Sequence, residues 1–226
     1  MIPARSIEVC VFDAYGTLLD ISAMIERFRP DLDDTSEAFF KLWRKRQLEI
    51  SWLPRRMAGG ADFWNVTAEA LEEAMSAFGL DDNALRGRLM GAWLEPDLYS
   101  DVSDSLHRLR EGGIKTAILS NGSPKMLAAG LRFTGLDTAL DAVLSAAEAG
   151  VFKPEQAVYK LVVEHFHMEP HSVCFVSGNA WDVTAAALSG FQVVWVNRTG
   201  ARSETPPRGT GAAITTLAEL PALLGA

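Results

Sequence analysis

The C-terminal half of the chain alternates short apolar segments with amphipathic ones, and this alternation constrains the fold more than any other feature. Apolar runs rich in β-branched residues predict strands at 114–121, 141–146, 172–177 and 191–197. Segments with helical spacing predict helices at 101–113, 124–135, 154–166 and 181–190. Strands that alternate with helices form a mostly parallel sheet through right-handed crossovers. This half of the chain therefore predicts a doubly wound α/β fold.

A further strand and a helical insertion are predicted before this alternating half. Residues 6–13, with the sequence SIEVCVFD, form an apolar run that predicts a buried strand ending at Asp13. Apolar residues then recur at helical spacing, and no strand pattern interrupts them. The overall prediction is an α/β, doubly wound, mostly parallel Rossmann-like sheet with a helical cap inserted after the first strand. The expected segments are a core at 1–19 and 99–226, a cap at 20–98, a loop at 201–212 and a short final helix at 215–225.

The composition argues against several classes of function. The formal net charge is -8, so nonspecific binding to nucleic acid or to an anionic membrane is not expected. Cys10 and Cys174 lie in apolar runs, which predicts buried free thiols rather than a disulfide framework. The sequence shows neither a signal-peptide pattern nor an apolar run of membrane-spanning length. A cytoplasmic location is therefore expected.

Polar residues stand at the ends of three predicted core strands: Asp13, then Ser120 with Asn121, then Ser177. Ligands of doubly wound sheets bind at the carboxyl ends of the strands, so these residues are expected to converge. A carboxylate there can act as a nucleophile and form an ester, with Thr17 orienting it. The alternative is that Asp13 and the Asn-Gly pair at 121–122 only form turns.

Two segments after the second core strand also carry candidate residues. Lys153 precedes a helix predicted to begin at Pro154, where its charge is unfavourable unless an anion lies nearby. Tyr159 on that helix is otherwise a core or rim residue. Ser177, Asn179 and Asp182 exceed what a turn requires and can position a water molecule. Asp182 alone is explained equally well as a charge in the first turn of a helix.

These motifs, in this order, resemble the haloacid dehalogenase-like superfamily. The matching stretches are FDAYGTLLD, SNG, FKP and VSGNAWD, which run through almost the whole chain. Tyr15 stands where the metal-dependent phosphatases of the superfamily carry a second aspartate, and Gly178 stands where they often carry another carboxylate. The insertion contains Trp43-Arg44 and Gln47-Leu48-Glu49, similar to the L-2-haloacid dehalogenases. Taken alone, Arg44 is interpreted as a surface charge, and Leu48 and Phe63 as core.

The resemblance implies hydrolysis of short L-2-haloalkanoic acids to D-2-hydroxy acids through an ester on Asp13. It implies a catalytic set of Asp13, Thr17, Lys153, Ser177, Asn179 and Asp182. It implies a substrate-binding set of Ala14, Tyr15, Arg44, Leu48, Phe63, Ser120, Asn121, Tyr159 and Trp181. Within these sets, Asn179 and Ser177 are expected to orient Asp182 toward a water molecule. No metal and no cofactor are expected, and the partners are the anionic haloacid, the halide ion and a second copy of the chain in a homodimer.

Three alternatives stay open at this level: defluorination of fluoroacetate in the same site, a metal-dependent small-molecule phosphatase, and a non-catalytic relative. One departure from the family pattern is Gly178, because the family commonly has two serines before the NAWD sequence. The missing hydroxyl is expected to loosen the water site. Asp20, Pro54 and residues 57–60 have no assigned role.

Overall fold

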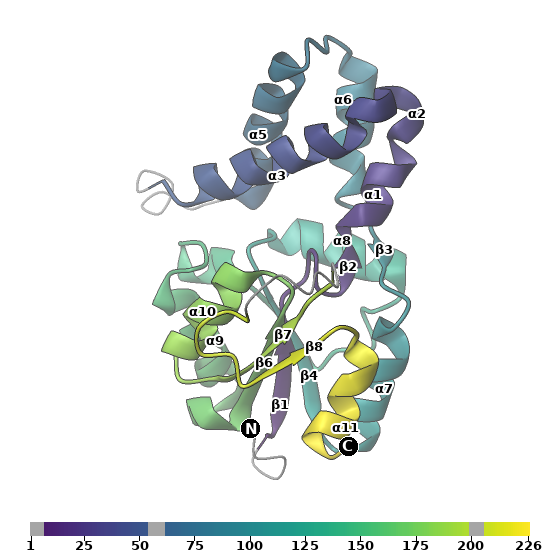
Figure 1. Ribbon diagram of the computed structural model, residues 1–226. Helices are drawn as coiled ribbons and strands as arrows, with labels where there is room; N and C mark the ends of the chain where they lie inside the picture. Colours follow the sequence, from purple (N-terminus) through teal and green to yellow (C-terminus); the bar gives the residue numbers. More distant parts are fainter. Residues whose placement is uncertain (1–6, 54–61, 199–205) are drawn as a thin grey trace.

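The computed structural model describes residues 7–53, 62–198 and 206–226, and its centre is a six-stranded sheet (Figure 1). The strand order is β5-β4-β1-β6-β7-β8, and every neighbouring pair is parallel. The strands are β1 (Val9–Phe12), β4 (Lys115–Ser120), β5 (Ala142–Ser145), β6 (Val173–Ser177), β7 (Gln192–Val196) and β8 (Ala212–Ile214). The chain extends the sheet first to one side of β1 and then to the other, which confirms the doubly wound prediction.

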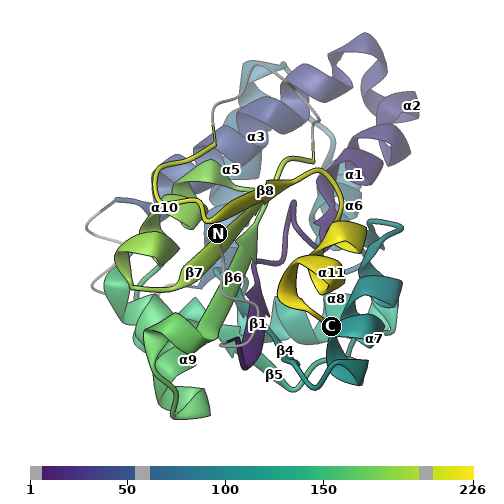
Figure 2. The same ribbon diagram turned by 60° about the horizontal axis from the view of Figure 1, so that its bottom comes forward.

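Helices cover both faces of the sheet (Figure 2). They are α7 (Val102–Glu111), α8 (Pro124–Thr134), α9 (Gln156–Phe166), α10 (Ala180–Leu188) and α11 (Leu220–Leu224). Helices α7 and α11 lie together on one side, and α9 and α10 lie together on the other (Figures 1 and 2). The strands are buried on both faces, which is why β1 and, up to its last residue Ser177, β6 consist of unbroken apolar residues rather than alternating ones.

Two local predictions were wrong. Helix α9 begins at Gln156 rather than at Pro154, because its N-cap residue Glu155 has an extended backbone, and Lys153-Pro154 lies in the preceding turn. Residues 206–211 of the predicted loop contain no helix or strand, but strand β8 (Ala212–Ile214), which was not predicted, begins at the last residue of that segment and pairs with β7. This short strand depends on its neighbour for hydrogen bonds, and three residues are too few to show a pattern. Residues 199–205 lie outside the described ranges.

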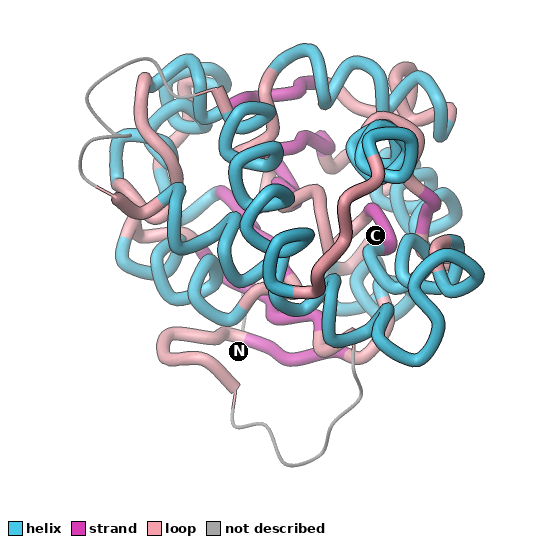
Figure 3. The backbone as a smooth tube through the Cα atoms, turned by 90° about the horizontal axis from the view of Figure 1, so that it is seen from above, coloured by secondary structure: helices cyan, strands magenta, loops and turns pink. Residues whose placement is uncertain are grey.

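The helical insertion stands over the carboxyl ends of the strands (Figures 1 and 3). Its helices are α1 (Ile21–Arg27), α2 (Arg29–Leu32), α3 (Ser36–Ser51), α5 (Phe63–Ala77) and α6 (Asn83–Ala92). Aromatic side chains of α3 form its centre, where Phe39 packs edge-to-face on Phe40, Trp43 and Phe78. No helix in the described ranges is both long and apolar enough to cross a bilayer.

A two-stranded antiparallel ribbon joins the insertion to the sheet. It consists of β2 (Leu19–Asp20) and β3 (Asp97–Leu98), so the chain leaves and returns at adjacent points. The structure also gives Asp20 a role, because its carboxylate caps α1 by accepting from the backbone N–H groups of Ser22 and Ala23. Pro54 and residues 57–60, which had no assigned role, lie outside the described residues.

Candidate active site

The carboxylate of Asp13, directly after β1, is the centre of a buried polar cluster. Its Oδ2 atom accepts from the hydroxyl of Thr17 at 3.1 Å and from the side-chain amide of Asn179 at 2.7 Å. Its Oδ1 atom accepts from the ammonium group of Lys153 at 3.1 Å. The turn after the strand is tight, because the carbonyl of Ala14 accepts from the N–H groups of the next turn. One carboxylate oxygen therefore has two donors and the other has one.

Lys153 links Asp13 to a second carboxylate, that of Asp182. The ammonium group lies 3.1 Å from Oδ1 of Asp13 and 2.8 Å from Oδ2 of Asp182, and the side chain is 1% exposed. Burial alone lowers the pKa of Lys153, but the two carboxylates outweigh it and raise the pKa above its ordinary value. The side-chain oxygen of Asn121 accepts from the backbone N–H of Lys153 at 2.8 Å and fixes its position. Lys153 therefore stays charged between the two acids.

Asp182 is fully buried in the first turn of α10. Its Oδ1 atom accepts from the hydroxyl of Tyr159 at 2.5 Å, and its Oδ2 atom accepts from Lys153 and from the hydroxyl of Ser177 at 3.2 Å. Burial raises the pKa of Asp182 to about 6, against the lowering effect of Lys153 and with a further raising effect of Asp13. Asp182 thus changes protonation state within reach of neutral pH, which suits a general base.

Two contacts differ from those expected from the sequence. The side chain of Asn179 bonds Asp13 and the carbonyl of Tyr15 rather than Asp182, although its backbone N–H does bond the hydroxyl of Ser177. Tyr159 is fully buried behind Asp182 and is not among the residues that line the cavity beside Asp13. Its position suits orienting Asp182 better than contacting a substrate.

A small cavity adjoins Asp13 at the seam between the sheet and the insertion. Its lining residues are Asp13, Tyr15, Arg44, Leu48, Phe63, Ser120, Asn121, Lys153 and Trp181. These residues come from several separate parts of the sequence, and all belong to the sets named above. The cavity volume is about 10 Å³, which leaves room for roughly one water molecule. The space beside Asp13 is therefore smaller than a haloacid substrate.

Arg44 is the cation that the insertion brings to this cavity. Its Nη1 atom donates to the side-chain oxygen of Gln47 at 2.5 Å, and the amide of Gln47 donates to the hydroxyl of Thr67 at 2.6 Å. The guanidinium also lies 5.9 Å from the ring centroid of Trp93. Burial lowers the pKa of Arg44, with Asp13 opposing that effect, but an arginine stays charged under all ordinary conditions.

Three of these supporting residues were absent from the predicted site: Gln47, Thr67 and Trp93. Gln47 was noticed only as part of a motif, although its place three residues after Arg44 on a helix is a usable signal for a side-chain contact. Thr67 and Trp93 had no sequence signal, because Thr67 meets Gln47, and Trp93 meets Arg44, only once the helices of the insertion have packed together.

Tyr15 cannot replace the acid that the phosphatases carry at this place. Its hydroxyl donates to the carbonyl of Trp93 at 3.1 Å, and its ring lies 4.9 Å from the ring of Trp93. Burial raises the pKa of Tyr15 further above its ordinary value, with Arg44 opposing that effect. The hydroxyl therefore holds the insertion in place and is too weak an acid to protonate a leaving group near neutral pH.

The residues around Asp13 do not fit a divalent cation. An ammonium group, that of Lys153, already lies between the carboxylates of Asp13 and Asp182. A side chain at Gly178 would place its Cβ 2.3 Å from the carbonyl oxygen of Gly16, so a third carboxylate has no room there. In the ranges that the structure describes, no three His, Cys, Asp or Glu residues are grouped in a way that could hold a metal ion. The chemistry below therefore uses no metal.

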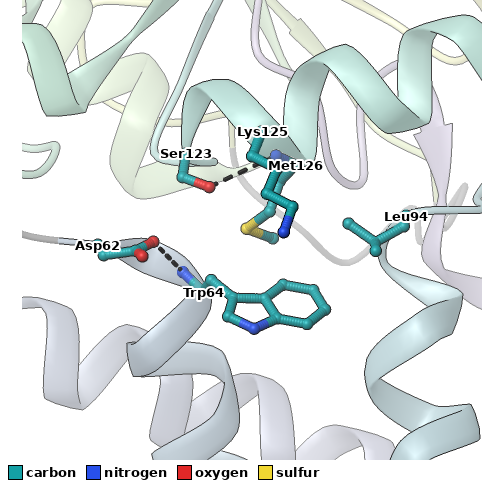
Figure 4. Close-up of a pocket in the computed structure, with 6 residues that line it drawn as sticks. All are labelled: Asp62, Trp64, Leu94, Ser123, Lys125 and Met126. Carbon is teal, nitrogen blue, oxygen red and sulfur yellow. Dashed lines mark hydrogen bonds between the residues drawn. The ribbon is translucent and has the colours of Figure 1, made fainter.

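A second cavity lies on the same seam, with a volume of about 170 Å³ (Figure 4). Its lining comprises Asp62, Trp64, Leu94, Ser123, Lys125 and Met126. The ammonium group of Lys125 and the sulfur of Met126 both point toward the indole ring of Trp64 (Figure 4). Trp64 directly follows Phe63, which lines the smaller cavity. The seam is thus loosely packed on the side of α5 and α8 and tightly packed at Asp13.

A model of the haloacid dehalogenase-like hydrolase family matches residues 7–190. The chain belongs to this family. The family predicted from the four motifs is therefore confirmed. Membership agrees with the order of Asp13, Ser120, Lys153 and Asp182 along the chain.

Several relatives share almost the whole chain. The (S)-2-haloacid dehalogenase 4A of Burkholderia cepacia is 43% identical over 86% of this chain and 85% of its own length. The (S)-2-haloacid dehalogenase 1 of Pseudomonas sp. (strain CBS-3) is 41% identical over 96% of each chain. A solved structure of the L-2-haloacid dehalogenase from Xanthobacter autotrophicus, with chloropropionic acid covalently bound, is 34% identical. It covers 97% of this chain and 98% of its own, with a TM-score of 0.86.

Proposed function

We propose that this chain is a hydrolytic (S)-2-haloacid dehalogenase that converts short L-2-haloalkanoic acids to D-2-hydroxy acids through an aspartyl ester. The observation that carries the proposal is the buried carboxylate of Asp13, held by Thr17, Asn179 and Lys153 at the edge of a small cavity. The relatives named (S)-2-haloacid dehalogenase, and the solved relative with covalently bound chloropropionic acid, support the same reaction.

The first half-reaction is a displacement at the carbon that carries the halogen. Oδ1 of Asp13 has one donor and Oδ2 has two, so Oδ1 retains the electron pair best placed for attack. It attacks C2 from the side opposite the halogen, and the carbon–halogen bond breaks with its electron pair leaving on the halide. A halide needs no proton, so the bound hydroxyl of Tyr15 is no obstacle. Back-side attack inverts C2.

The cavity supplies contacts for both ends of the substrate. Ser120 and the backbone N–H groups of Ala14 and Tyr15 hold the substrate carboxylate at the strand end. Arg44 and Asn121, with the rings of Phe63 and Trp181, receive the departing halide in a mostly apolar wall that includes Leu48. The positive charges of Lys153 and Arg44 balance the negative charges of Asp13 and Asp182. The anionic substrate brings the net charge of the site to -1, and the net charge stays at -1 when Asp13 becomes an ester and the halogen becomes a halide ion. No step separates charge across the cavity, which favours the reaction in a water-poor site.

The second half-reaction is hydrolysis of the ester on Asp13. Asp182 removes a proton from a water molecule, which attacks the Cγ atom of Asp13. A carboxylate has about four acceptor positions, and three on Asp182 are taken by Tyr159, Lys153 and Ser177, so one is left for the water. Oδ2 of Asp13 becomes the oxyanion between its donors Thr17 and Asn179. Collapse of this intermediate breaks the bond between Cγ and Oδ1, and the departing alkoxide oxygen takes back the proton held by Asp182. This releases the D-2-hydroxy acid, and loss of the remaining proton to solvent restores the carboxylate of Asp13.

We further propose that residues 20–98 act as a cap that opens to admit the substrate. The cavity beside Asp13 has room for roughly one water molecule, and Arg44, Leu48 and Phe63 reach it from the insertion. The seam must therefore widen in every turnover. The ribbon of β2 and β3 is the covalent link across that seam and is the natural hinge.

Halide release tests the function. Purified protein with EDTA is given L- and D-2-chloropropionate, with fluoroacetate and an aryl phosphate as parallel substrates. Release from the L form only, yielding D-lactate, supports the proposal. Release of phosphate that depends on added Mg²⁺ would overturn it.

A single turnover in H₂¹⁸O tests the ester directly. The hydroxyl oxygen of the product comes from Asp13, so the label is expected in Asp13 and not in the lactate. Label in the lactate formed during the first turnover would mean that water attacks C2 directly. Asp13→Asn serves as the matched control, because the amide retains the shape of the side chain and is expected to release no halide.

The cytoplasm and a homodimer are proposed as the location and the assembly. The two cysteines, Cys10 and Cys174, are free and buried, which suits a reducing compartment. Trp52 and Leu53, at the end of α3, are more than a third exposed and give the insertion an apolar surface. Sedimentation analysis tests the assembly, and a monomer at micromolar concentration would contradict it.

A further inference from the structure

A buried arginine on the far side of the nucleophile touches both chain segments that connect the sheet to the insertion. Arg198 follows β7, and its side chain is 11% exposed. Its Nη2 atom donates to the carbonyl of Thr17 at 2.6 Å, and its Nη1 atom forms an ion pair with Asp101 at 2.6 Å. The guanidinium lies 3.9 Å from the ring centroid of Tyr99. None of these contacts reaches the cavity.

The three partners of Arg198 flank the ribbon that joins the two parts of the molecule. Thr17 lies two residues before β2, where the chain leaves the sheet, and Tyr99 directly follows β3, where it returns. The backbone N–H of Tyr99 also donates to the carbonyl of Leu18 at 3.1 Å. The outgoing and returning segments are therefore held together at the base of the ribbon, and Arg198 binds both of them.

The ion pair is itself anchored to the body of the sheet domain. Asp101 stands at the start of α7, and its Oδ2 atom accepts from the hydroxyl of Thr216 at 2.6 Å and from the N–H of Leu217 at 2.8 Å. Burial raises the pKa of Asp101, but the hydrogen bonds from Arg198, Thr216 and Leu217 outweigh it and hold the pKa below its ordinary value. Arg198 therefore ties the hinge to a charged and fixed point.

The nucleophile Asp13 is connected to this hinge by one hydrogen bond and by one turn of the chain. The hydroxyl of Thr17 donates to Oδ2 of Asp13 and accepts from the N–H of Gly178 at 3.0 Å. Asp13 is separated from the start of β2 at Leu19 by one tight turn. If the cap opens in every turnover, the same motion pulls on the turn that aims the carboxylate. Some contact has to keep that motion from reaching Asp13.

We propose that Arg198 is a positioning residue that fixes the base of the hinge, so that the carboxylate of Asp13 keeps its orientation while the cap moves. The contacts of Arg198 with Thr17, Tyr99 and Asp101 are called the clamp. This inference rests on the proposed dehalogenation and adds a residue outside the cavity to it. The clamp acts through the carbonyl of Thr17, with Asp101 as its anchor and Tyr99 as the surface against which it is held. Arg198 touches neither the substrate nor the reacting atoms.

The first experiment compares Arg198→Gln with Arg110→Gln. Arg110 is an exposed arginine on α7, so its replacement removes the same charge without touching the hinge. The rate of halide release in a single turnover reports the alkylation step. We expect Arg198→Gln to slow it about 10- to 100-fold, since a displacement of about 1 Å at the reacting group costs roughly that much, with KM changed less than about threefold. An unchanged alkylation rate, or a loss confined to KM, would overturn the clamp.

A double-mutant cycle with Thr17→Val separates positioning from a general loss of stability. Valine keeps the backbone carbonyl that Arg198 binds but removes the hydroxyl that transmits its effect to Asp13. If Arg198 acts through Thr17, adding Arg198→Gln to Thr17→Val is expected to cost less than about threefold, because the coupling has already been lost. Losses that multiply in full would show that Arg198 acts elsewhere.

Thermal unfolding accompanies each variant. If Arg198→Gln does not fold, Tyr99→Leu replaces it, because it removes only the surface behind the guanidinium and leaves the ion pair. Tyr99→Leu is then expected to slow alkylation several-fold, with the same lack of additivity, and a rate equal to that of the unaltered protein would overturn the clamp. If the unaltered protein releases no halide from any haloacid, the failure belongs to the proposed function and not to Arg198.

Discussion

The hydroxyl of Tyr159 is one of the groups that lower the pKa of Asp182, the proposed general base, and Tyr159→Phe tests this with one atom removed. The hydroxyl donates to Oδ1 of Asp182 at 2.5 Å, and the ring packs edge-to-face on Phe175 and Phe191. Phenylalanine retains this packing. The hydrogen bond stabilises the charged form of Asp182, so its loss raises the pKa of that carboxyl from its value of about 6.

The size of the shift follows from the strength of the bond. A hydrogen bond to a charged group contributes about 1.5–3 kcal/mol, and each pKa unit corresponds to about 1.4 kcal/mol, so the pKa of Asp182 is expected to rise by about 1–2 units. Only the deprotonated carboxylate can accept a proton from water. In the ester Asp13 is uncharged, so its raising effect on the pKa of Asp182 is lost. The ester-hydrolysis rate is therefore expected to rise with pH through the pKa of Asp182 in this state, and to do so at a higher pH in Tyr159→Phe.

The assay is rapid-quench measurement of ester decay over a range of pH, after one turnover with L-2-chloropropionate. Tyr99→Phe is the matched control, because Tyr99 has no contact with Asp182 and its variant is expected to keep the original pH profile. An acid limb that stays in place or moves to lower pH in Tyr159→Phe would refute the assignment of Asp182 as the base. A limb that appears in halide release rather than in ester decay would place Asp182 in the wrong half-reaction.

Three other changes have defined outcomes. Gly178→Ala forces the new Cβ against the carbonyl of Gly16 and is expected to lower the free energy of unfolding by about 1–3 kcal/mol. The control is Gly91→Ala on α6, which has open space around it. The free energy of unfolding of this control is expected to stay equal or to rise by up to about 1 kcal/mol. Gln47→Leu removes the contact that aims Arg44 and is expected to lower kcat/KM about tenfold, since one hydrogen bond to a charged group is lost; a smaller effect than twofold in steady-state halide release would contradict that role. Asp182→Asn is expected to accumulate the ester, seen as an adduct in the intact mass after substrate is added, and an absence of adduct with halide still released would contradict the order of steps.

The amino-acid pattern determined most of the scaffold because the relevant signals are local. Apolar runs bounded by glycine and polar residues predicted β1, β4, β5, β6 and β7, and their alternation with helices is enough to require a parallel sheet. Parallel strands bring their carboxyl ends to one edge, so Asp13, Ser120 and Ser177 had to meet there. The family resemblance added Arg44, which nothing in its helix distinguished from a surface charge.

Only the tertiary structure decided which atoms meet. Asn179 was expected to serve Asp182, but its side chain bonds Asp13, because hydrogen-bond partners depend on the approach of two loops and not on spacing within one. The same approach explains Gly178, since a methyl group there would overlap the carbonyl of Gly16. Strand β8 exists because β7 offers it a free edge.

The supporting residues were hidden from sequence for the same reason. Thr67 reaches Gln47 and Trp93 reaches Arg44 through helix packing, and Arg198 reaches Thr17 from a position 181 residues later. A sequence pattern records which face of an element is apolar and where the element ends. It does not record which distant polar group fills the remaining hydrogen-bond positions, because that choice is made by the geometry of the folded chain.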